Sequence, residues 1–295
     1  MLTDREISEL PPEAPVLLAG PTASGKSELA LRIAEGTGRT IVNADALQVY
    51  SNWQVLTARP DSATLQRCDH ALYGHVAPDE TYSVGSWTRE VEPLLGGTPA
   101  PVIVGGTGLY FRALTEGLAD IPPVRDDIRQ EAAARLAAGE VDELAKALDA
   151  ETLQRIDMSN PRRIQRAWEV QRATGRGLAD WHDSTPPPLI ALPDTRPFLL
   201  EADRDWLAAR IAQRFDAMLA GGVLDEVEAN LADWDPDRPS SAAIGAPELV
   251  AHMQGKMTLF DAREAAVTAT RQYAKRQRTW FRARMSGWVP LTVPS

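Results

Sequence analysis

The sequence predicts an α/β protein whose core is a parallel β-sheet covered by helices on both faces, with an all-helical insertion domain. Three short apolar runs, at residues 16–19, 40–44 and 101–104, alternate with helical patterns. Continuous apolar runs of this length are typical of strands buried on both faces of a parallel sheet. From residue 125 to about residue 183 the chain is rich in Ala, Glu and Arg and contains no strand candidate. That stretch is therefore predicted to be a separate helical domain.

Proline-rich segments mark the ends of this insertion. Ile121-Pro122-Pro123 precedes it, and Pro186-Pro187-Pro188 closes it. Proline removes a backbone donor and interrupts helices, so such segments suit a domain boundary. We therefore divide the chain into a first core segment at residues 1–121, the insertion at residues 122–190, and a second core segment at residues 191–295.

The remaining core elements follow in order along the chain. The first strand ends at Gly20, and a helix over residues 26–35 carries a regular apolar face. The second strand ends at Asp45 and, in a simple βαβ unit, is expected beside the first. After the insertion, a strand at residues 198–200 returns the chain to the core. Helices are predicted at residues 205–220, 224–231 and 261–285.

Length and composition agree with a globular protein. The chain has 295 residues, of which 44% are hydrophobic and 24% charged. No apolar run approaches the roughly 18 residues of a membrane helix, and no secretory signal is visible at the start. We therefore expect a cytoplasmic protein without membrane contact. Cys68 is the only cysteine, which excludes an intrachain disulfide and a cysteine-based zinc site.

A phosphate-binding loop follows the first strand. Residues 20–27 fit the pattern G-x-x-x-x-G-K-[ST], with a strand before and a helix after. Glycines allow successive backbone N–H groups to face an anion, and the helix N-terminus adds partial positive charge. Lys26 can reach an outer phosphate, and the Ser27 hydroxyl can hold Mg²⁺. We therefore predict binding of a phosphate or diphosphate ester, against the alternative of a glycine turn without a ligand.

Two further features follow strands at the same sheet edge, where ligands bind in open α/β sheets. Asp45 could ligate Mg²⁺, act as a general base, or cap a helix. Gly105-Gly106-Thr107-Gly108 follows the third strand, and the Thr107 hydroxyl could bind a ligand, although a tight turn is an equal alternative. Kinases and ATPases usually place a magnesium-binding Asp after such a strand. Only Asp45 could take that role here.

The charge distribution favours a polyanionic partner. The net charge of −10 and pI near 5.0 argue on average against nucleic-acid binding. However, the predicted C-terminal helix aligns Arg271, Lys275, Arg278 and Arg282 on one side, and we expect it to pack through Tyr273 and Trp280 on the other. Like charges at i,i+4 repel, so this row suggests a polyanion rather than only a solvated face.

A second group of cations lies in the insertion. Asn160-Pro161 is a typical helix start, and Arg162, Arg163 and Arg166 follow it, opposite Ile164 and Trp168. Two basic helices, one in each domain, could hold an RNA stem, and such contacts would be sensitive to salt.

Two further arginines lie one turn apart on the predicted helix at residues 205–220. Arg210 and Arg214 are spaced i,i+4, so they share a face of that helix. One of them could close over a diphosphate; pairing with nearby carboxylates on the same helix is the alternative.

Six segments resemble the bacterial tRNA dimethylallyltransferase family. In family order they are GPTASGKS (20–27), NADALQVY (43–50), GGTGLY (105–110), RRIQRAWEV (162–170), AIG (243–245) and TRQYAKRQRTWFR (270–282). The resemblance implies a P-loop NTPase-like core with a helical insertion. It also implies transfer of a dimethylallyl group from dimethylallyl diphosphate to N6 of the adenosine 3′ of the anticodon, with Mg²⁺ as cofactor. The implied partner is the tRNA anticodon stem-loop, and we expect a monomer.

The resemblance also implies residue roles. Asp45 is the general base, while Thr107 and Arg210, rather than Arg214, stabilise the departing diphosphate. Ser27 is the metal ligand within the diphosphate-binding set Gly20, Thr22, Ala23, Ser24, Gly25, Lys26 and Ser27. The implied tRNA-binding set is Asp45, Ala46, Leu47, Gln48, Arg162, Arg163, Ile164, Gln165, Arg166, Lys275, Arg276, Arg278 and Arg282. The chain departs from the common family pattern at Ala46, at Leu56 and Arg59 of the segment Leu56-Thr57-Ala58-Arg59, and at Ala246-Pro247.

Two other functions remain as alternatives. A P-loop kinase acting on a small molecule or nucleoside could use Asp45 as a base toward a hydroxyl, but the arginine-rich helices and the missing magnesium carboxylate count against it. A nucleotide-binding regulator without chemistry is less favoured, because Asp45 and Thr107 are predicted at one sheet edge.

Overall fold

The computed structural model of the protein describes residues 1–293 and contains two compact units. Unit 1 combines Met1–Thr115 with Ile190–Ser295, and unit 2 is Glu116–Leu189. The chain thus leaves unit 1 once and returns once, so unit 2 is an insertion. Each unit has its own core and is described by itself.

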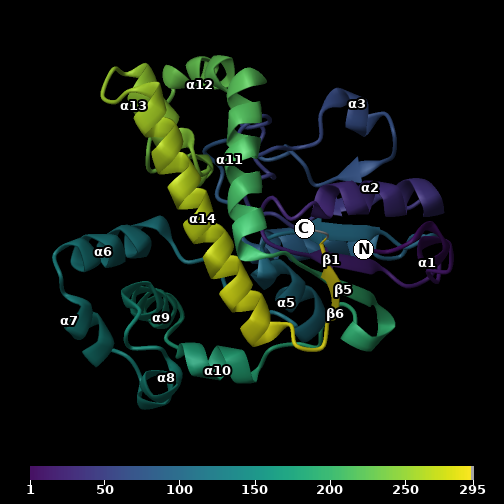
Figure 1. Ribbon diagram of the computed structural model, residues 1–295. Helices are drawn as coiled ribbons and strands as arrows, with labels where there is room; N and C mark the ends of the chain where they lie inside the picture. Colours follow the sequence, from purple (N-terminus) through teal and green to yellow (C-terminus); the bar gives the residue numbers. More distant parts are fainter. Residues whose placement is uncertain (294–295) are drawn as a thin grey trace. The chain divides into compact units, whose positions relative to one another are not determined.

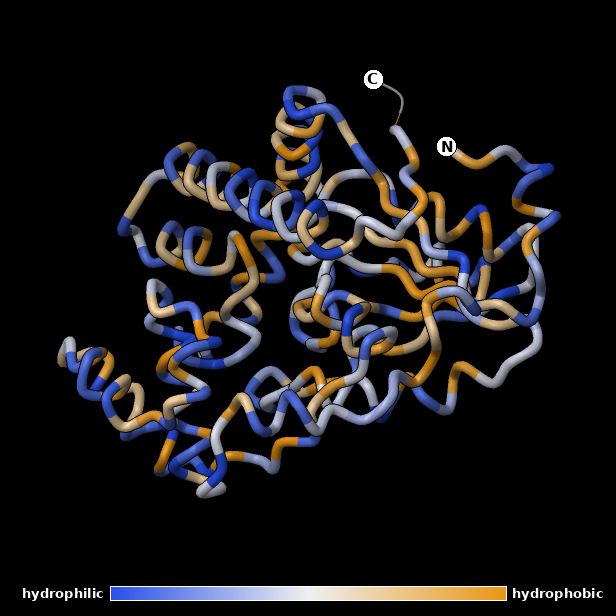
Figure 2. Tube along the Cα trace, turned by 90° about the horizontal axis from the view of Figure 1, so that it is seen from below, coloured by the Kyte–Doolittle hydropathy of each residue, from blue (hydrophilic) through white to orange (hydrophobic). Residues whose placement is uncertain are grey.

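Unit 1 is built on a six-stranded sheet in which every neighbouring pair of strands is parallel. The order across the sheet is β3-β2-β4-β1-β5-β6. Figure 2 shows hydrophobic residues concentrated along these strands. The strands are β1 (Val16–Ala19), β2 (Ile41–Asn43), β3 (His70–Ala71), β4 (Val102–Gly105), β5 (Arg196–Glu201) and β6 (Val289–Thr292).

The strands are buried on both faces, as their apolar sequences predict. Val16 and Leu18 pack with Leu29 of the following helix, whereas Leu17, which points to the opposite face, is also fully buried. The α/β class with a parallel sheet is therefore confirmed.

The position of β2 in the sheet corrects one expectation. β2 does not lie beside β1, because β4 pairs with both and separates them. The order of strands along the chain does not determine their order in the sheet, since a crossover can pass a neighbouring position that a later strand fills. The consequence is functional: the glycine turn after β4 lies between the phosphate loop after β1 and Asp45 after β2.

Helices surround this sheet in unit 1. The long helix α14 runs beside α11, and the two are in contact (Figure 1). The helices are α1 (Asp4–Ser8), α2 (Lys26–Thr37), α3 (Ser62–Leu65), α4 (Val84–Val91), α5 (Gly108–Glu116), α11 (Arg204–Ala220), α12 (Val223–Leu231), α13 (Ala246–Met253) and α14 (Leu259–Arg284), with short 3-10 turns at Glu92–Leu94, Leu192–Asp194 and Pro239–Ala242.

Unit 2 contains helices and no strand among its described residues, as the sequence predicts. A small core forms around Leu144, Ile164 and Trp168, which are almost fully buried. The helices are α6 (Asp126–Ala137), α7 (Val141–Lys146), α8 (Ala150–Arg155), α9 (Pro161–Thr174) and α10 (Leu178–Asp183).

Several elements were not expected from the sequence. β3 has only two residues, too few for a recognisable period, and β6 includes a proline. α13 begins at Ala246 with Pro247 in its first turn, a position that proline tolerates because that N–H has no helical partner. The unusual Ala246-Pro247 pair is therefore a helix start.

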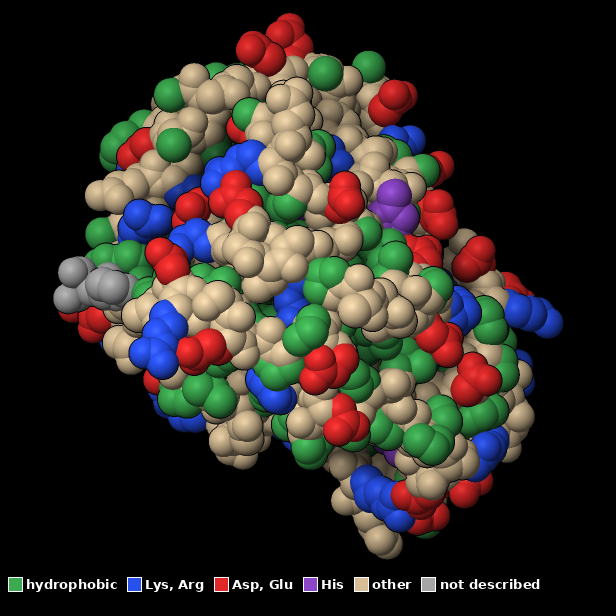
Figure 3. Space-filling view, turned by 90° about the vertical axis from the view of Figure 1, so that its right-hand side faces the viewer, with side chains coloured by type: hydrophobic (Ala, Val, Ile, Leu, Met, Phe, Trp, Pro, Cys, Tyr) green, Lys and Arg blue, Asp and Glu red, His purple; other side chains and the backbone are tan. Residues whose placement is uncertain are grey.

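On the face of the molecule shown in Figure 3, acidic and basic side chains are interspersed, and the acidic ones form no separate patch. Within residues 1–293, no helix is long and apolar enough to cross a membrane.

Candidate active site

The phosphate loop connects β1 to α2 in a tightly curled backbone. Gly25 has φ of 86°, a conformation that glycine adopts without strain, and it directly precedes the first helical residue, Lys26. The N–H of Ser24 donates to the carbonyl of Pro21 at 3.3 Å, which closes the loop. The N-terminus of α2 therefore faces the centre of the loop, as required for an anion site.

Lys26 extends back over the same loop. Its Nζ donates to the carbonyl oxygen of Pro21 at 3.3 Å. Burial lowers the pKa of Lys26 to about 8, although the negative charge of Asp45 opposes this shift. Lys26 is therefore a cation whose charge changes close to neutral pH.

Asp45 and Thr107 meet at the sheet edge after β2 and β4. The Asp45 carboxylate accepts from the N–H of Leu47 at 3.0 Å, and the Thr107 hydroxyl accepts from the N–H of Ala46 at 3.0 Å. No helix begins at Asp45, so the helix-cap alternative is excluded. The carboxylate instead lines a pocket shared with the phosphate loop.

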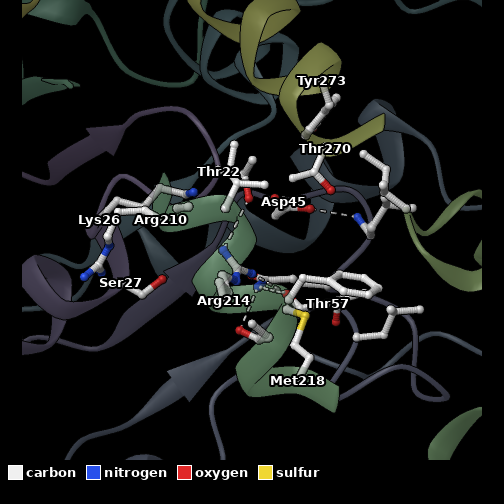
Figure 4. Close-up of a pocket in the computed structure, with 18 of the residues that line it drawn as sticks. Thr22, Lys26, Ser27, Asp45, Thr57, Arg210, Arg214, Met218, Thr270 and Tyr273 are labelled. Atoms are coloured by element: carbon white, nitrogen blue, oxygen red, sulfur yellow. Dashed lines mark hydrogen bonds between the residues drawn. The ribbon is translucent and has the colours of Figure 1, made fainter. Parts of the chain in front are cut away.

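Two arginines of α11 reach this pocket at different depths. Arg214 donates from Nη1 to the Thr22 hydroxyl at 3.3 Å and from Nη2 to the carbonyl of Thr57 at 3.4 Å (Figure 4). Burial lowers its pKa, and Asp45 opposes that shift. Arg210 is exposed, and its guanidinium lies 5.2 Å from the ring centre of Trp206. Both arginines line the pocket, and Arg214 is the one that hydrogen-bonds to the phosphate loop.

The pocket has a volume of about 470 Å³, within the usual range for small-molecule sites. All of its lining residues belong to unit 1. Polar groups come from the phosphate loop, Asp45 and α11, and apolar side chains form the remaining wall (Figure 4). The apolar lining consists of Ala23, Leu47, Leu56, Ala58, Ile211, Phe215, Met218 and Ile244. Such a site suits a ligand with an anionic end and a short hydrocarbon end.

The helix α14 closes one side of the pocket. Thr270 and Tyr273 line it, and burial raises the pKa of Tyr273 above its usual value, as does the charge of Asp45. Gln277, which is 5% exposed, contacts both the phosphate loop and the turn after β4. Neither Thr270 nor Gln277 was expected at the site, because polar residues inside a basic helix give no signal of where the helix packs.

The packing of α14 differs in part from the expected face. Tyr273 and Trp280 are only partly buried, whereas Ala274, Gln277 and Phe281 are buried. The buried face of α14 is therefore rotated about the helix axis from the predicted face. The reason is that α14 contacts both the turn after β4 and the helices α11 and α13.

The cations of α14 remain available to a partner. Arg271, Lys275, Arg276 and Arg282 are exposed, and Arg278 is partly exposed. The helix does form an ion pair near its start, between Arg263 and Asp216, but within residues 1–293 no carboxylate pairs with those five cations. Arg278 does lie close enough to Asp203 for its charge to help lower the pKa of that carboxyl. The row is therefore a basic surface whose charges are mostly not paired.

The predicted RNA-facing set of α9 needs a correction. Arg162, Arg163 and Arg166 are exposed, but Ile164 and Gln165 are only 1% and 8% exposed. Ile164 belongs to the core of unit 2, and Gln165 donates to Glu169 within the helix. Consecutive residues of a helix point in different directions, so a continuous segment cannot present every side chain to RNA.

The segment after Asp45 is partly buried throughout. Leu47 and Gln48 line the pocket, whereas Ala46 does not. Gln48 donates from Nε2 to the carbonyls of Thr57 and Ala58 at 2.8 and 3.1 Å. Gln48 therefore holds the loop whose Leu56, Thr57 and Ala58 line the pocket.

The chain offers few protein ligands for a metal. Within residues 1–293 there is no cluster of three or more His, Cys, Asp or Glu side chains suited to a metal ion. The Ser27 hydroxyl and the Asp45 carboxylate line the same pocket. Such oxygen donors fit Mg²⁺, which usually keeps several waters and takes its other ligands from substrate phosphates.

Comparison with known proteins gives a consistent result. A family model described as "IPP transferase" matches residues 48–284, and one described as "Isopentenyl transferase" matches residues 15–73. A tRNA dimethylallyltransferase of Ruegeria sp. is 58% identical over 283 residues, covering 96% of this chain and 97% of the relative. The tRNA dimethylallyltransferase of Dinoroseobacter shibae is 57% identical over 289 residues, covering 97% of each chain.

Solved structures are similar over nearly the whole chain. The tRNA isopentenylpyrophosphate transferase of Bacillus halodurans aligns with a TM-score of 0.67 and 28% identity, covering 95% of this chain and 90% of that one. A eukaryotic dimethylallyltransferase acting on tRNA aligns with a TM-score of 0.78 at 24% identity, covering 96% of this chain and 74% of that one. The second likeness concerns the fold alone.

Proposed function

Because this chain belongs to the IPP transferase family, we propose that it transfers a dimethylallyl group from dimethylallyl diphosphate to N6 of the adenosine 3′ of the anticodon in tRNA. One observation carries the proposal: the phosphate loop, Asp45 and Arg214 come together around a pocket with an apolar wall. Thr107 does not line this pocket, but its hydroxyl accepts from the N–H of Ala46, next to Asp45. The polar end suits a diphosphate, and the apolar wall suits a five-carbon chain.

In the proposed step the bond between C1 of the donor and the diphosphate oxygen breaks, and a bond between N6 and C1 forms. Asp45 takes the proton that N6 loses, since an aromatic amine is a poor nucleophile until its proton is removed. Diphosphate leaves with the electrons of the broken bond. The phosphate loop, Lys26, the Thr107 hydroxyl and an arginine of α11 stabilise its developing charge.

Mg²⁺ is part of this proposal. Ser27 would hold the ion, with diphosphate oxygens and water as its other ligands. Bound at Ser27, the ion would offset the negative charge that develops on the leaving diphosphate. No phosphoryl group is transferred in this reaction, so the carboxylate that a kinase places after the third strand is not needed.

The acceptor is proposed to bind through two basic surfaces, the exposed arginines of α9 and the row of cations on α14. N6 can reach Asp45 only if the adenosine leaves the anticodon stack, so base flipping is expected. We propose the anticodon stem-loop as the partner and a cytoplasmic monomer as the working form.

The decisive experiment is mass analysis of nucleosides from unmodified tRNA incubated with the purified protein, dimethylallyl diphosphate and Mg²⁺. The expected product is dimethylallyl-adenosine at the position 3′ of the anticodon, with one diphosphate released per transfer and no consumption of ATP. Unchanged adenosine would refute the proposal, and ATP turnover with a small hydroxyl substrate would favour the kinase.

Substituting two cations of α14 should weaken tRNA binding. In an Arg278→Ala/Arg282→Ala variant, the slope of log affinity against log salt should become shallower by about 0.7–0.9 for each phosphate that the protein no longer neutralises. The kcat at saturating tRNA should change little. The control is an Arg5→Ala/Arg89→Ala variant, which removes the same charge elsewhere in unit 1 and should keep the original slope in filter-binding titrations. Equal slopes for all three proteins would contradict an RNA-binding role for the cations of α14.

Donor binding should weaken as pH rises through the pKa of Lys26, about 8. Below that pH the ammonium is charged and attracts the diphosphate; above it the charge is lost. Calorimetry between pH 7 and 9 should show falling affinity for dimethylallyl diphosphate and proton uptake on binding, because the anion favours the charged form. The Lys26→Arg variant keeps its positive charge over this pH range and should show neither effect. If the unsubstituted protein and the variant have the same pH dependence of donor affinity, Lys26 is not the cause of that dependence.

A further inference from the structure

The side-chain amide of Gln277 joins two backbone segments that are far apart in sequence. Its Oε1 accepts from the N–H of Thr22 in the phosphate loop at 2.9 Å, and its Nε2 donates to the carbonyl of Gly106 after β4 at 2.9 Å. The side chain is 5% exposed, so water does not substitute for these bonds. One amide on α14 thereby ties the phosphate loop to the neighbouring strand end.

The connection continues to Asp45. Thr107, next to Gly106, donates its N–H to the carbonyl of Ala44 at 3.2 Å and accepts from the N–H of Ala46 at 3.0 Å. These two partners flank Asp45 in the sequence. A continuous series of hydrogen bonds therefore runs from the phosphate loop through Gln277 and the turn after β4 to the backbone around the candidate base, whose side chain lies near Thr22 in Figure 4.

The turn after β4 is shaped for this contact. A Cβ atom on Gly106 would lie 2.3 Å from Nε2 of Gln277 and 3.4 Å from Oδ2 of Asp45, so only glycine permits the approach without a shift. The Thr22 N–H is directed to Gln277, so it is not among the amides that would hold the diphosphate. Gln277 thus fixes the loop from outside the anion site.

We propose that Gln277 is a positioning residue for prenyl transfer, which sets the separation between the diphosphate loop and Asp45. This inference rests on the proposed function. The donor is held by the loop and the N6 proton goes to Asp45, so the distance between loop and carboxylate determines whether C1, N6 and the base are aligned. Misplacement by about 1 Å can cost about a hundredfold in rate.

The alternative is that Gln277 only stabilises the fold. Loss of two buried hydrogen bonds would lower stability in either case, so stability alone does not discriminate. A fall in kcat without a matching change in KM does discriminate between the two roles, because a misaligned site still binds both substrates but reacts slowly. The buried Ala274 and Phe281 also anchor α14, so the helix should stay in place when Gln277 is replaced.

The first test is Gln277→Met, which keeps the length of the side chain and removes both hydrogen bonds. We expect kcat to fall by about ten- to a hundredfold, with each KM changed by less than about threefold. Gln171→Met is the matched control: Gln171 accepts from the N–H of Asp149 at 2.9 Å and donates to the carbonyl of Ala147 at 2.7 Å, within unit 2. It should lower the melting temperature and leave kcat unchanged.

The second test is Gln277→Glu, measured across pH. An ionised carboxylate accepts from Thr22 but repels the carbonyl of Gly106, whereas the protonated acid can donate to it. The ratio of the variant's kcat to that of the unsubstituted enzyme should therefore rise as pH falls. A ratio that stays flat or falls with decreasing pH would contradict the proposal. So would an unchanged kcat in Gln277→Met, or an equal loss of kcat in Gln277→Met and Gln171→Met.

Amide hydrogen exchange separates this inference from the proposed function. In Gln277→Met, exchange at the Thr22 amide should accelerate, since its acceptor is gone. If the unsubstituted protein leaves tRNA unmodified, the proposed function fails, and exchange alone then decides whether Gln277 ties the loop to the turn after β4. Unchanged exchange at Thr22 would overturn the inference whether or not the enzyme is active.

Discussion

Asp45→Asn should lower kcat for prenyl transfer by at least about a hundredfold, the usual cost of losing a general base. The amide keeps the size of the side chain and can still accept from the N–H of Leu47, so the local turn should persist. What it loses is the ability to take the N6 proton. Single-turnover rates with prebound tRNA would measure this loss directly, separated from binding.

The affinity of the Asp45→Asn variant for tRNA should be close to that of the unsubstituted enzyme, since the basic surfaces are untouched. Asp69→Asn is a suitable control, because Asp69 is exposed, undergoes the same change of charge, and is not among the residues that line the pocket. A fully active Asp45→Asn variant would show that another group takes the proton.

Arg214→Met should reduce kcat by about a hundred- to a thousandfold, the range found when a charge-stabilising donor is removed from a transition state. Arg214 is enclosed by the pocket and already hydrogen-bonded to Thr22 of the phosphate loop. Its positive charge is therefore poorly screened by water and acts strongly on the leaving diphosphate.

Arg210→Met is the matched comparison, one turn earlier on the same helix. Arg210 is exposed and lies over Trp206, so solvent screens its charge, and we expect a loss of about tenfold or less. Rates at saturating donor and tRNA would rank the two variants. A larger loss in Arg210→Met than in Arg214→Met would restore the assignment that the sequence resemblance implies.

Several features of the site were predictable because local chemistry determines them. The phosphate loop needs glycines, a lysine and a following helix within eight residues, and its pattern is recognisable in residues 20–27. The apolar strands before Gly20, Asp45 and Gly105 indicated that all three segments end at one edge, since neighbouring strands are parallel. The helical character of the insertion was equally visible in its composition.

Other features depend on contacts between distant segments. Sequence spacing could not place β4 between β1 and β2. Nor could it show that Arg214 hydrogen-bonds to Thr22 while Arg210 is exposed, because helical periodicity gives both arginines the same face. Gln277 had no recognisable signal, since its partners, Thr22 and Gly106, are backbone groups of other elements.

The sequence by itself determined the α/β class, the pattern of the phosphate loop, the position of Asp45 after a strand and the two basic helices, whereas the role of Asp45 as a base was implied by the family resemblance. Each depends on residue types within one turn, strand or helix. Only the tertiary structure decided the order of the strands, the burial of Ile164 and Gln165, and which polar side chains of α14 and α11 enter the pocket. The physical reason is that burial and hydrogen bonding are set by what an element packs against, which its own sequence does not specify.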